Sequence, residues 1–190
     1  EYGSDSQMEP GSGSTIMSYA GVSGSYDLQA HNDPYFHHRS VYDISTFIEI
    51  TSCATEQPTH NTPPDIPDLP SYTIPKGTAY LLEGKATDAD GDSLLYTWEQ
   101  ADNRTNGSGY YFSPLLNNGA TARSLPPSTL PYRYIPRLSR IVAGTLTQEN
   151  PKRNDAWETV LERGRTLHWS FVVIDRPNDA NQMGNTAYKT

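Results

Sequence analysis

Five prolines between residues 54 and 70 are the feature that most constrains how this chain can fold. Proline fixes φ and lacks a backbone N–H, so this stretch cannot continue a helix or the centre of a sheet, and we expect a stiff linker. Residues 1–53 hold 7 acidic residues and 1 basic residue, a net charge of −6, whereas the remainder holds 15 acidic and 13 basic residues, a net charge of −2. We therefore expect three parts: residues 1–53, a Pro-rich linker over 54–70, and residues 71–190.

Composition excludes several classes of protein. No run approaches the roughly 18 apolar residues of a membrane-spanning helix, so no membrane span is expected. The net charge of −8 and the lack of a basic patch argue against nucleic-acid binding, because phosphate recognition requires clustered Lys and Arg. A single cysteine, Cys53, excludes a disulfide framework within this sequence. It is expected either to pair with a cysteine outside this sequence or to be a small buried residue.

The first part combines a loop with one helix. Residues 1–30 are rich in Gly and Ser and cannot build a core alone. A helix is indicated further on, since apolar residues fall on one helical face: Val41, Ile44, Phe47 and Ile48. Either residues 32–34, which read Asn-Asp-Pro, or Ser40 with Asp43 three residues later is expected to start this helix.

After the linker the apolar period changes to two, which is typical of strands. The expected strands are Ser71–Ile74, Thr78–Glu83, Leu94–Glu99 and Leu167–Asp175. Residues 75–77, Pro-Lys-Gly, are expected to form a turn between the first two. Leu167–Asp175 is apolar on both faces near its end, which indicates a central strand.

These patterns predict a mainly β fold: an immunoglobulin-like β-sandwich with a long insertion, preceded by a loop and a helix. The insertion covers the irregular residues 101–155, which are rich in Asn, Gly and Pro. Residues 156–162 are expected to form a short helix or strand. The sequence can end inside the final strand, which would leave the sandwich truncated.

One motif resembles a known family. Residues 14–21 read Ser-Thr-Ile-Met-Ser-Tyr-Ala-Gly, which resembles the Met-turn of the metzincin zinc metallopeptidases, especially serralysin and astacin relatives. The wider run over 9–21, with Asp-Pro-Tyr-Phe-His at 33–37, is similar to bacterial secreted reprolysin-like metallopeptidases. In those proteins a PKD-like sandwich with sequences like those at 72–77 and 86–92 follows the catalytic unit. The resemblance identifies residues 1–53 as the C-terminal segment of a metzincin catalytic domain.

The resemblance implies a zinc-dependent endopeptidase that hydrolyses peptide bonds in protein or peptide substrates. Metzincins bind zinc through HExxHxxGxxH, whose Glu activates the attacking water. The resemblance implies that Met17 forms the hydrophobic floor beneath the metal, and that Tyr19 stabilises the transition-state oxyanion. It further implies that residues 20–30 line the pocket for the substrate side chain after the scissile bond.

This sequence contains no HExxH motif. Its histidines are His31, His37, His38, His60 and His168. We therefore expect zinc ligands to lie upstream of Glu1 in a longer protein, and this chain alone to be inactive. The adjacent pair His37 and His38 is not expected to chelate one ion, because neighbours on a helix point about 100° apart.

A second candidate metal site lies in Asp-Ala-Asp-Gly-Asp at residues 88–92. Three carboxylates at alternate positions, Asp88, Asp90 and Asp92, can surround one hard cation such as calcium. The pattern resembles the calcium loops of PKD-like and cadherin-like sandwiches, which often use an Asp at the end of a late strand. The resemblance therefore implies Asp175, with Asn61 as a weaker ligand. The alternative is a polar turn without an ion.

An EF-hand is not expected around the same residues. Glu99 falls at position 12 of a loop counted from Asp88, where an EF-hand has its bidentate Glu. Position 6 is Ser93, although the sharp bend there requires Gly, and residues 94–99 alternate as a strand does.

Two other functions remain open. The first is a non-catalytic, calcium-stabilised sandwich that binds an extracellular polymer or a protein. Its ligand face would consist of Tyr110, Tyr111, Tyr132 and Tyr134, unless these side chains cover the sandwich core. The second is a spacer or folding aid for the peptidase. Low apolar content and a calcium loop favour a secreted, extracellular protein in either case.

Overall fold

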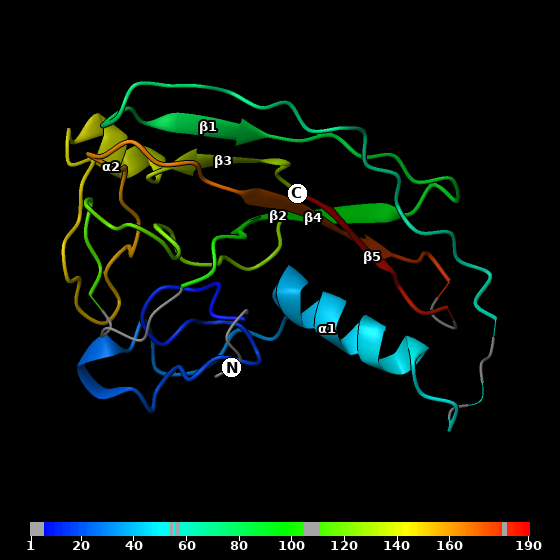
Figure 1. Cartoon of the computed structure of the whole chain (residues 1–190). Helices are drawn as coiled ribbons and strands as arrows, with labels where there is room; N and C mark the ends of the chain where they lie inside the picture. Colours follow the sequence, from blue (N-terminus) through cyan, green and yellow to red (C-terminus); the bar gives the residue numbers. More distant parts are fainter. Residues whose placement is uncertain (1–5, 54, 56–57, 105–110, 180–181) are drawn as a thin grey trace.

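The computed structural model describes residues 6–53, 55, 58–104, 111–179 and 182–190 and shows a β-rich chain with two sheets (Figure 1). In chain order its elements are the 3-10 helix η1 (Gly24–Tyr26), α1 (His38–Glu49), β1 (Tyr80–Glu83), β2 (Ser93–Gln100), β3 (Tyr132–Ile135), α2 (Leu138–Val142), β4 (Trp169–Arg176) and β5 (Thr186–Lys189). Within the described residues, no helix has the length and apolar character needed to cross a membrane.

Both sheets are antiparallel. β1 pairs with β3, and the second sheet has the order β2-β4-β5, so β4 is the central strand, as its two apolar faces predicted. Trp98 of β2 lies opposite Phe171 of β4, and Glu99 lies opposite Ser170. Since side chains alternate along a strand, these two pairs point to opposite faces of the sheet.

The face that carries Trp98 and Phe171 holds one hydrophobic core. It is built from Ile66, Trp98, Phe171 and Val173, with half-buried neighbours from β1, β2 and β5. Ile66 comes from the Pro-rich segment, which therefore packs against the sheet. Gly84 follows β1 and allows close approach here, because a Cβ at this position would lie 2.6 Å from the Phe171 ring.

The opposite face of the same sheet is directed toward α1, which lies on the far side of this sheet from β1 and β3 in Figure 1. Glu99 and Val172 are buried on this face, and the ring of Tyr188 in β5 lies 5.6 Å from that of His38. Only His38 and Ser40 of α1 are buried. The helix therefore contacts the sheet through its first turn.

A second hydrophobic core joins the start of the chain to the insertion. Its buried members are Leu28, Phe112, Leu116, Trp157 and Leu161. The backbone N–H of Asn154 donates to the carbonyl of Leu28 at 2.8 Å. Residues 6–35 are therefore packed on the insertion.

Charged side chains join Glu158 to β3 and to the start of α2, two elements that lie within residues 101–155, which were expected to be irregular. Glu158 is fully buried and pairs with Arg133 at 2.9 Å and with Arg137 at 3.2 Å. Arg133 also donates to the carbonyls of Trp98 and Arg123. The two guanidinium partners compensate the buried carboxylate, and the Arg137 side chain is partly exposed to solvent.

Several elements expected from the sequence differ in the structure. Residues 71–74 form no strand, because prolines flank them and Tyr72 and Ile74 are exposed without a strand partner. Residues 156–162 form neither a helix nor a strand. Trp157 has a φ of 51°, which breaks the extended run, and only an isolated bridge joins Glu158 to Ala122.

The helix also differs from expectation. α1 exists, but it begins at His38 and is capped by His37, so both expected starting points were wrong. Its expected apolar face is not packed: Ile44, Phe47 and Ile48 are exposed. The sequence correctly predicted the turn at residues 75–77 and the strands that became β1, β2 and β4.

Leu28→Ala is expected to lower the free energy of unfolding by about 2–5 kcal/mol, because Leu28 is 0 % exposed in the second core. Val22→Ala, at a position 79 % exposed in the same segment, is the control and should change it by less than about 0.5 kcal/mol. Urea denaturation of the chain measures both. Equal stability of the two variants would show that the N-terminal segment does not share this core.

Candidate functional site

The residues that resemble a Met-turn form a tight turn. The N–H of Ser18 donates to the carbonyl of Thr15 at 3.0 Å, which places Ile16 and Met17 at the two central positions. The N–H of Tyr19 then donates to the carbonyl of Ser12 at 2.9 Å. Met17 is 47 % exposed and Tyr19 is 42 % exposed. The structure thus presents both predicted side chains on one ordered turn.

Glu9 stabilises this turn through hydrogen bonds to its carboxylate. Its carboxylate accepts the backbone N–H of Ser14 at 3.0 Å and the hydroxyl of Thr15 at 2.6 Å. Gly13 has a φ of 69° and lies between Ser18 and Glu9. A Cβ at this position would lie 2.7 Å from the Cβ of Ser18. Asn32 closes the other side, since its Nδ2 donates to the carbonyl of Ile16 at 2.8 Å. Side-chain hydrogen bonds therefore fix the turn despite its glycine and serine content.

The aspartate loop is also ordered. The Oδ1 atom of Asp88 accepts the backbone N–H groups of Asp90 and Asp92, both at 3.0 Å. Asp92 accepts from the backbone and side chain of Asn178, and Asp90 accepts the N–H of Thr62 at 2.6 Å. These contacts bring together the loop, the middle of the Pro-rich segment at Thr62 and the residues after β4.

Asp175 is buried near this loop at the end of β4. Its carboxylate accepts from Asn61 Nδ2 at 2.9 Å and from the backbone N–H of Asn185. Asn61 is also buried, and the structure therefore links the two residues implied by the resemblance. Amide donors surround the Asp175 carboxylate, and no Lys or Arg among the described residues forms an ion pair with it.

Three buried oxygens in this region have no hydrogen-bond partner: Asn61 Oδ1, Asp88 Oδ2 and Asp92 Oδ2. A buried acceptor without a partner is unfavourable and is often explained by an ion or a water. The four aspartates, however, do not bring three carboxylate oxygens within 4.8 Å of one another. A cation there would therefore need the Asn61 oxygen and further oxygen ligands.

The sequence did not predict a third group of candidate ligand side chains. His37, His38 and Glu99 form the single group of three acidic, His or Cys side chains in the described chain whose ligand atoms lie within 4.8 Å of one another. Glu99 Oε2 lies 3.1 Å from His38 Nδ1 and 3.8 Å from His37 Nε2. It also accepts the backbone N–H of His38 at 2.6 Å. All three residues are buried, Glu99 completely.

The histidine cluster, as we call His37, His38 and Glu99, depends on where α1 begins. His37 has extended dihedrals, φ −63° and ψ 147°, and precedes the helix, so its ring is not rotated 100° from that of His38. The two ring centroids lie 4.3 Å apart. The geometric reason for expecting no shared ion was therefore wrong, because it assumed that both residues are helical; that the pair does not chelate one ion stays a prediction.

The electrostatics of the cluster favour a charged carboxylate and a neutral His38. Burial raises the pKa of Glu99, but His37 and the donors of His38 outweigh burial and bring the pKa below its ordinary value. Burial lowers the pKa of His38 below 6.5, although Glu99 opposes the shift. Glu99 lies at the N-terminus of α1, where the helix dipole also stabilises an anion.

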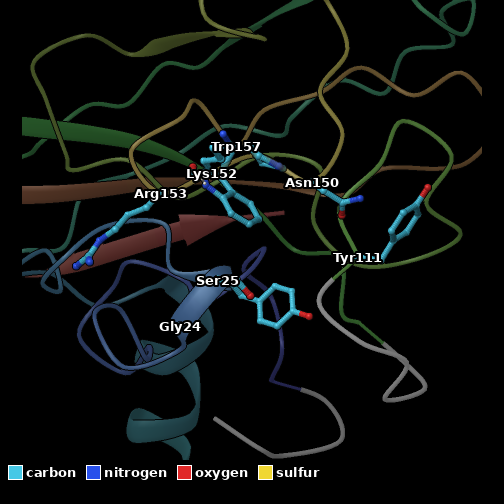
Figure 2. A pocket seen from close by; sticks show the side chains of 9 residues that line it. Gly24, Ser25, Tyr111, Asn150, Lys152, Arg153 and Trp157 are labelled. Carbon is cyan, nitrogen blue, oxygen red and sulfur yellow. Dashed lines mark hydrogen bonds between the residues drawn. The ribbon is translucent and has the colours of Figure 1, made fainter.

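An open cleft of about 640 Å³ lies between residues 24–26 and the insertion (Figure 2). Residues 150–153, Tyr111 and Trp157 form its other side. The indole Nε1 of Trp157 donates to the carbonyl of Lys152, and the hydroxyl of Tyr111 donates to Glu149. Its described lining includes two cationic side chains, Lys152 and Arg153, and two tyrosines, Tyr26 and Tyr111.

Cys53 is exposed and is not in a disulfide with any described residue. The expectation that it is a small buried residue was wrong. Pairing with a cysteine outside this sequence stays a prediction.

Comparisons with known proteins identify no relative: no family model, no curated protein and no solved structure matches this chain. The function is therefore inferred from the residues and contacts described above.

Glu9→Ala is expected to destabilise the turn that carries Met17, because Ser14 and Thr15 are buried and lose their acceptor. Leaving buried donors unpaired costs about 1–3 kcal/mol. Hydrogen exchange should show faster exchange at residues 14–18, with a matching fall in the free energy of unfolding. Glu162→Ala removes an exposed carboxylate and is the control. Unchanged exchange in Glu9→Ala would contradict the role of Glu9.

Proposed function

We propose that this chain is the C-terminal part of a secreted, zinc-dependent metalloendopeptidase of the metzincin type. Residues 1–53 would complete the peptidase unit, and the β-rich part would follow it as an immunoglobulin-like module. The substrates would be extracellular proteins or peptides.

The observation that carries this proposal is the turn at residues 15–18. A Met-turn requires a methionine at the apex of a tight bend, where it can form a floor beneath a metal. Met17 stands at such an apex, and hydrogen bonds from Glu9 and Asn32 hold the bend. Tyr19 follows two residues later with its side chain exposed, as a residue that reaches toward a substrate must be.

The exposed apolar surface of residues 6–53 gives further support. The apolar side chains that this segment buries are Met8, Leu28 and Tyr35. Those that it exposes include Ile16, Met17, Val22, Phe36, Phe47 and Ile48. Extended exposed apolar surface marks an interaction site. The remainder of a peptidase unit would cover such a surface.

The sequence has no HExxH motif, and the histidine cluster does not replace it, because it is buried and tied to a helix terminus. No hydrolytic step is therefore assigned to this chain alone. Its own contribution would be the floor at Met17 and a hydroxyl at Tyr19 that donates a hydrogen bond to the oxyanion.

Tyr19→Phe is expected to lower kcat about 10²-fold with little change in KM, since loss of one oxyanion donor has an effect of this size. The protein to assay is the gene product that includes the coding region upstream of Glu1. Casein hydrolysis, with and without 1,10-phenanthroline, is the measurement.

Tyr72→Phe removes the hydroxyl of a tyrosine that is 81 % exposed in the β-rich part, and it should leave kcat unchanged. Hydrolysis that resists the chelator, no hydrolysis at all, or equal kcat for Tyr19→Phe and the parent would overturn the proposal.

A second candidate function is a calcium-stabilised module that binds an extracellular polymer or protein. The three unpartnered oxygens of Asn61, Asp88 and Asp92 favour it. Of the proposed ligand face, Tyr132 and Tyr134 form an edge-to-face pair on β3 with centroids 5.9 Å apart, and Tyr111 is exposed. Tyr110 lies outside the described residues.

Calcium at about 100 times its Kd is expected to raise Tm by about 5 °C or more relative to EDTA, because a ligand that binds the folded state stabilises it by about 2.7 kcal/mol at that ratio. Asp92→Asn should abolish the shift, and Asp155→Asn, outside the loop, should retain it. Differential scanning fluorimetry measures the Tm of each variant in calcium and in EDTA. The same Tm in calcium and in EDTA would rule out the site.

A further inference from the structure

The contact between α1 and the three-stranded sheet depends on one buried carboxylate. Glu99 comes from β2, and the two histidines, the N-cap His37 and the first helical residue His38, come from the start of α1 more than 60 residues earlier. The ion pairs of Glu99 in the described chain are those with His37 and His38, and neither Lys nor Arg neutralises it. The ionisable partners of this carboxylate in the described chain are therefore two histidines.

His37 must keep one nitrogen unprotonated to do its work in the fold. Its Nδ1 atom accepts the backbone N–H of Arg39 at 3.2 Å and thereby caps α1. An acceptor carries no proton, so the neutral ring has its proton on Nε2, the atom that faces Glu99. Protonation of Nδ1 would remove the cap.

Glu99 must stay ionised for the same contact. Its Oε2 atom accepts the backbone N–H of His38 at 2.6 Å and faces the ring nitrogen of His38 at 3.1 Å. A protonated carboxyl group would be a much poorer acceptor at a helix N-terminus.

Other charged and titratable groups surround the cluster. Tyr35 precedes the helix and interacts with Glu99, and Arg39 lies beside His38 on α1. Tyr188 approaches from β5, and Arg133 acts on Tyr35 from β3. None of them ionises between pH 5 and 8, since burial raises the pKa of both tyrosines further above 10 and Arg stays charged.

We propose that His37, His38 and Glu99 form an acid-sensitive latch that fastens residues 6–53 to the three-stranded sheet. The latch does not depend on the peptidase function proposed above.

The direction of the pH dependence follows from the lowered pKa values of His38 and Glu99. The pKa of His38 is lowered in the fold, so its contribution to stability is complete above about 6.5 and is lost as the pH falls through its folded value. The pKa of Glu99 is also lowered, so its contribution persists to lower pH and is lost below about 4.5. The latch is therefore closed at neutral pH and weakens first on the histidine side.

A zinc-class metal is the competing occupant of the cluster, because two His and one Glu suit such an ion. Coordination by His37 Nε2 would require the proton on Nδ1, where it would face the N–H of Arg39. Metal-bound histidines instead direct that N–H to an oxygen acceptor. The orientation of His37 thus favours the latch.

The test is hydrogen exchange of the whole chain at pH 7.5 and pH 5.0 in EDTA. The measured exchange rates are corrected for the intrinsic exchange rate at each pH, so that they report protection alone. Protection of residues 38–41 is expected to fall about tenfold at pH 5.0, because this pH lies more than one unit below the ordinary His pKa of about 6.5, which His38 regains when the latch opens. His38→Asn removes the titrating ring and keeps the backbone N–H that donates to Glu99, so its loss should be under about threefold. His60→Asn, at an exposed His, is the matched control and should behave as the parent does.

A second measurement needs no variant. Nitrogen NMR of the histidine rings at pH 7.5 should show the proton of His37 on Nε2. Equal protection at both pH values, a loss in His38→Asn as large as in the parent, or a proton on His37 Nδ1 would overturn the latch. Stoichiometric zinc binding that Glu99→Gln abolishes would also overturn it and assign a metal centre instead.

Discussion

The arrangement of this protein depends on the Glu99 carboxylate, which is buried on one face of the central sheet at the N-terminus of α1. A buried carboxylate is strongly unfavourable unless hydrogen-bond donors surround it. Its Oε2 atom accepts the backbone N–H of His38 and faces the His38 ring at the helix N-terminus, whereas its Oε1 atom has no hydrogen-bond partner among the described residues. This contact joins the start of α1 to one face of the sheet.

The same contact decides where the Met17 turn lies. Residues 6–36 enter α1 through His37, and they are joined to the insertion by Leu28 and by Arg123, which pairs with Asp33. The β-rich part thus acts as the support for the turn. The turn exposes Met17 and Tyr19, and the proposal that it belongs to a peptidase unit rests on this exposure.

Sequence patterns predicted those parts of the fold that local rules determine. Alternation along 94–99 predicted β2, and the apolar run along 167–175 predicted β4, because a strand with one buried face alternates and a central strand is apolar on both faces. The cluster could not be predicted, since it joins residues more than 60 positions apart and depends on His37 being one residue outside the helix. The packing of Leu28 with Trp157 is likewise a long-range contact without a local signal. The partnering of Asn61 with Asp175 was implied only by a resemblance.

Residues 6–53 and the β-rich part are expected to unfold as one cooperative unit, because buried contacts at Leu28 and Glu99 join them. Differential scanning calorimetry of the chain tests this most directly. One transition, with a ratio of calorimetric to van't Hoff enthalpy of about 1, is the predicted result. Two separable transitions, the first of which releases residues 6–53, would contradict it.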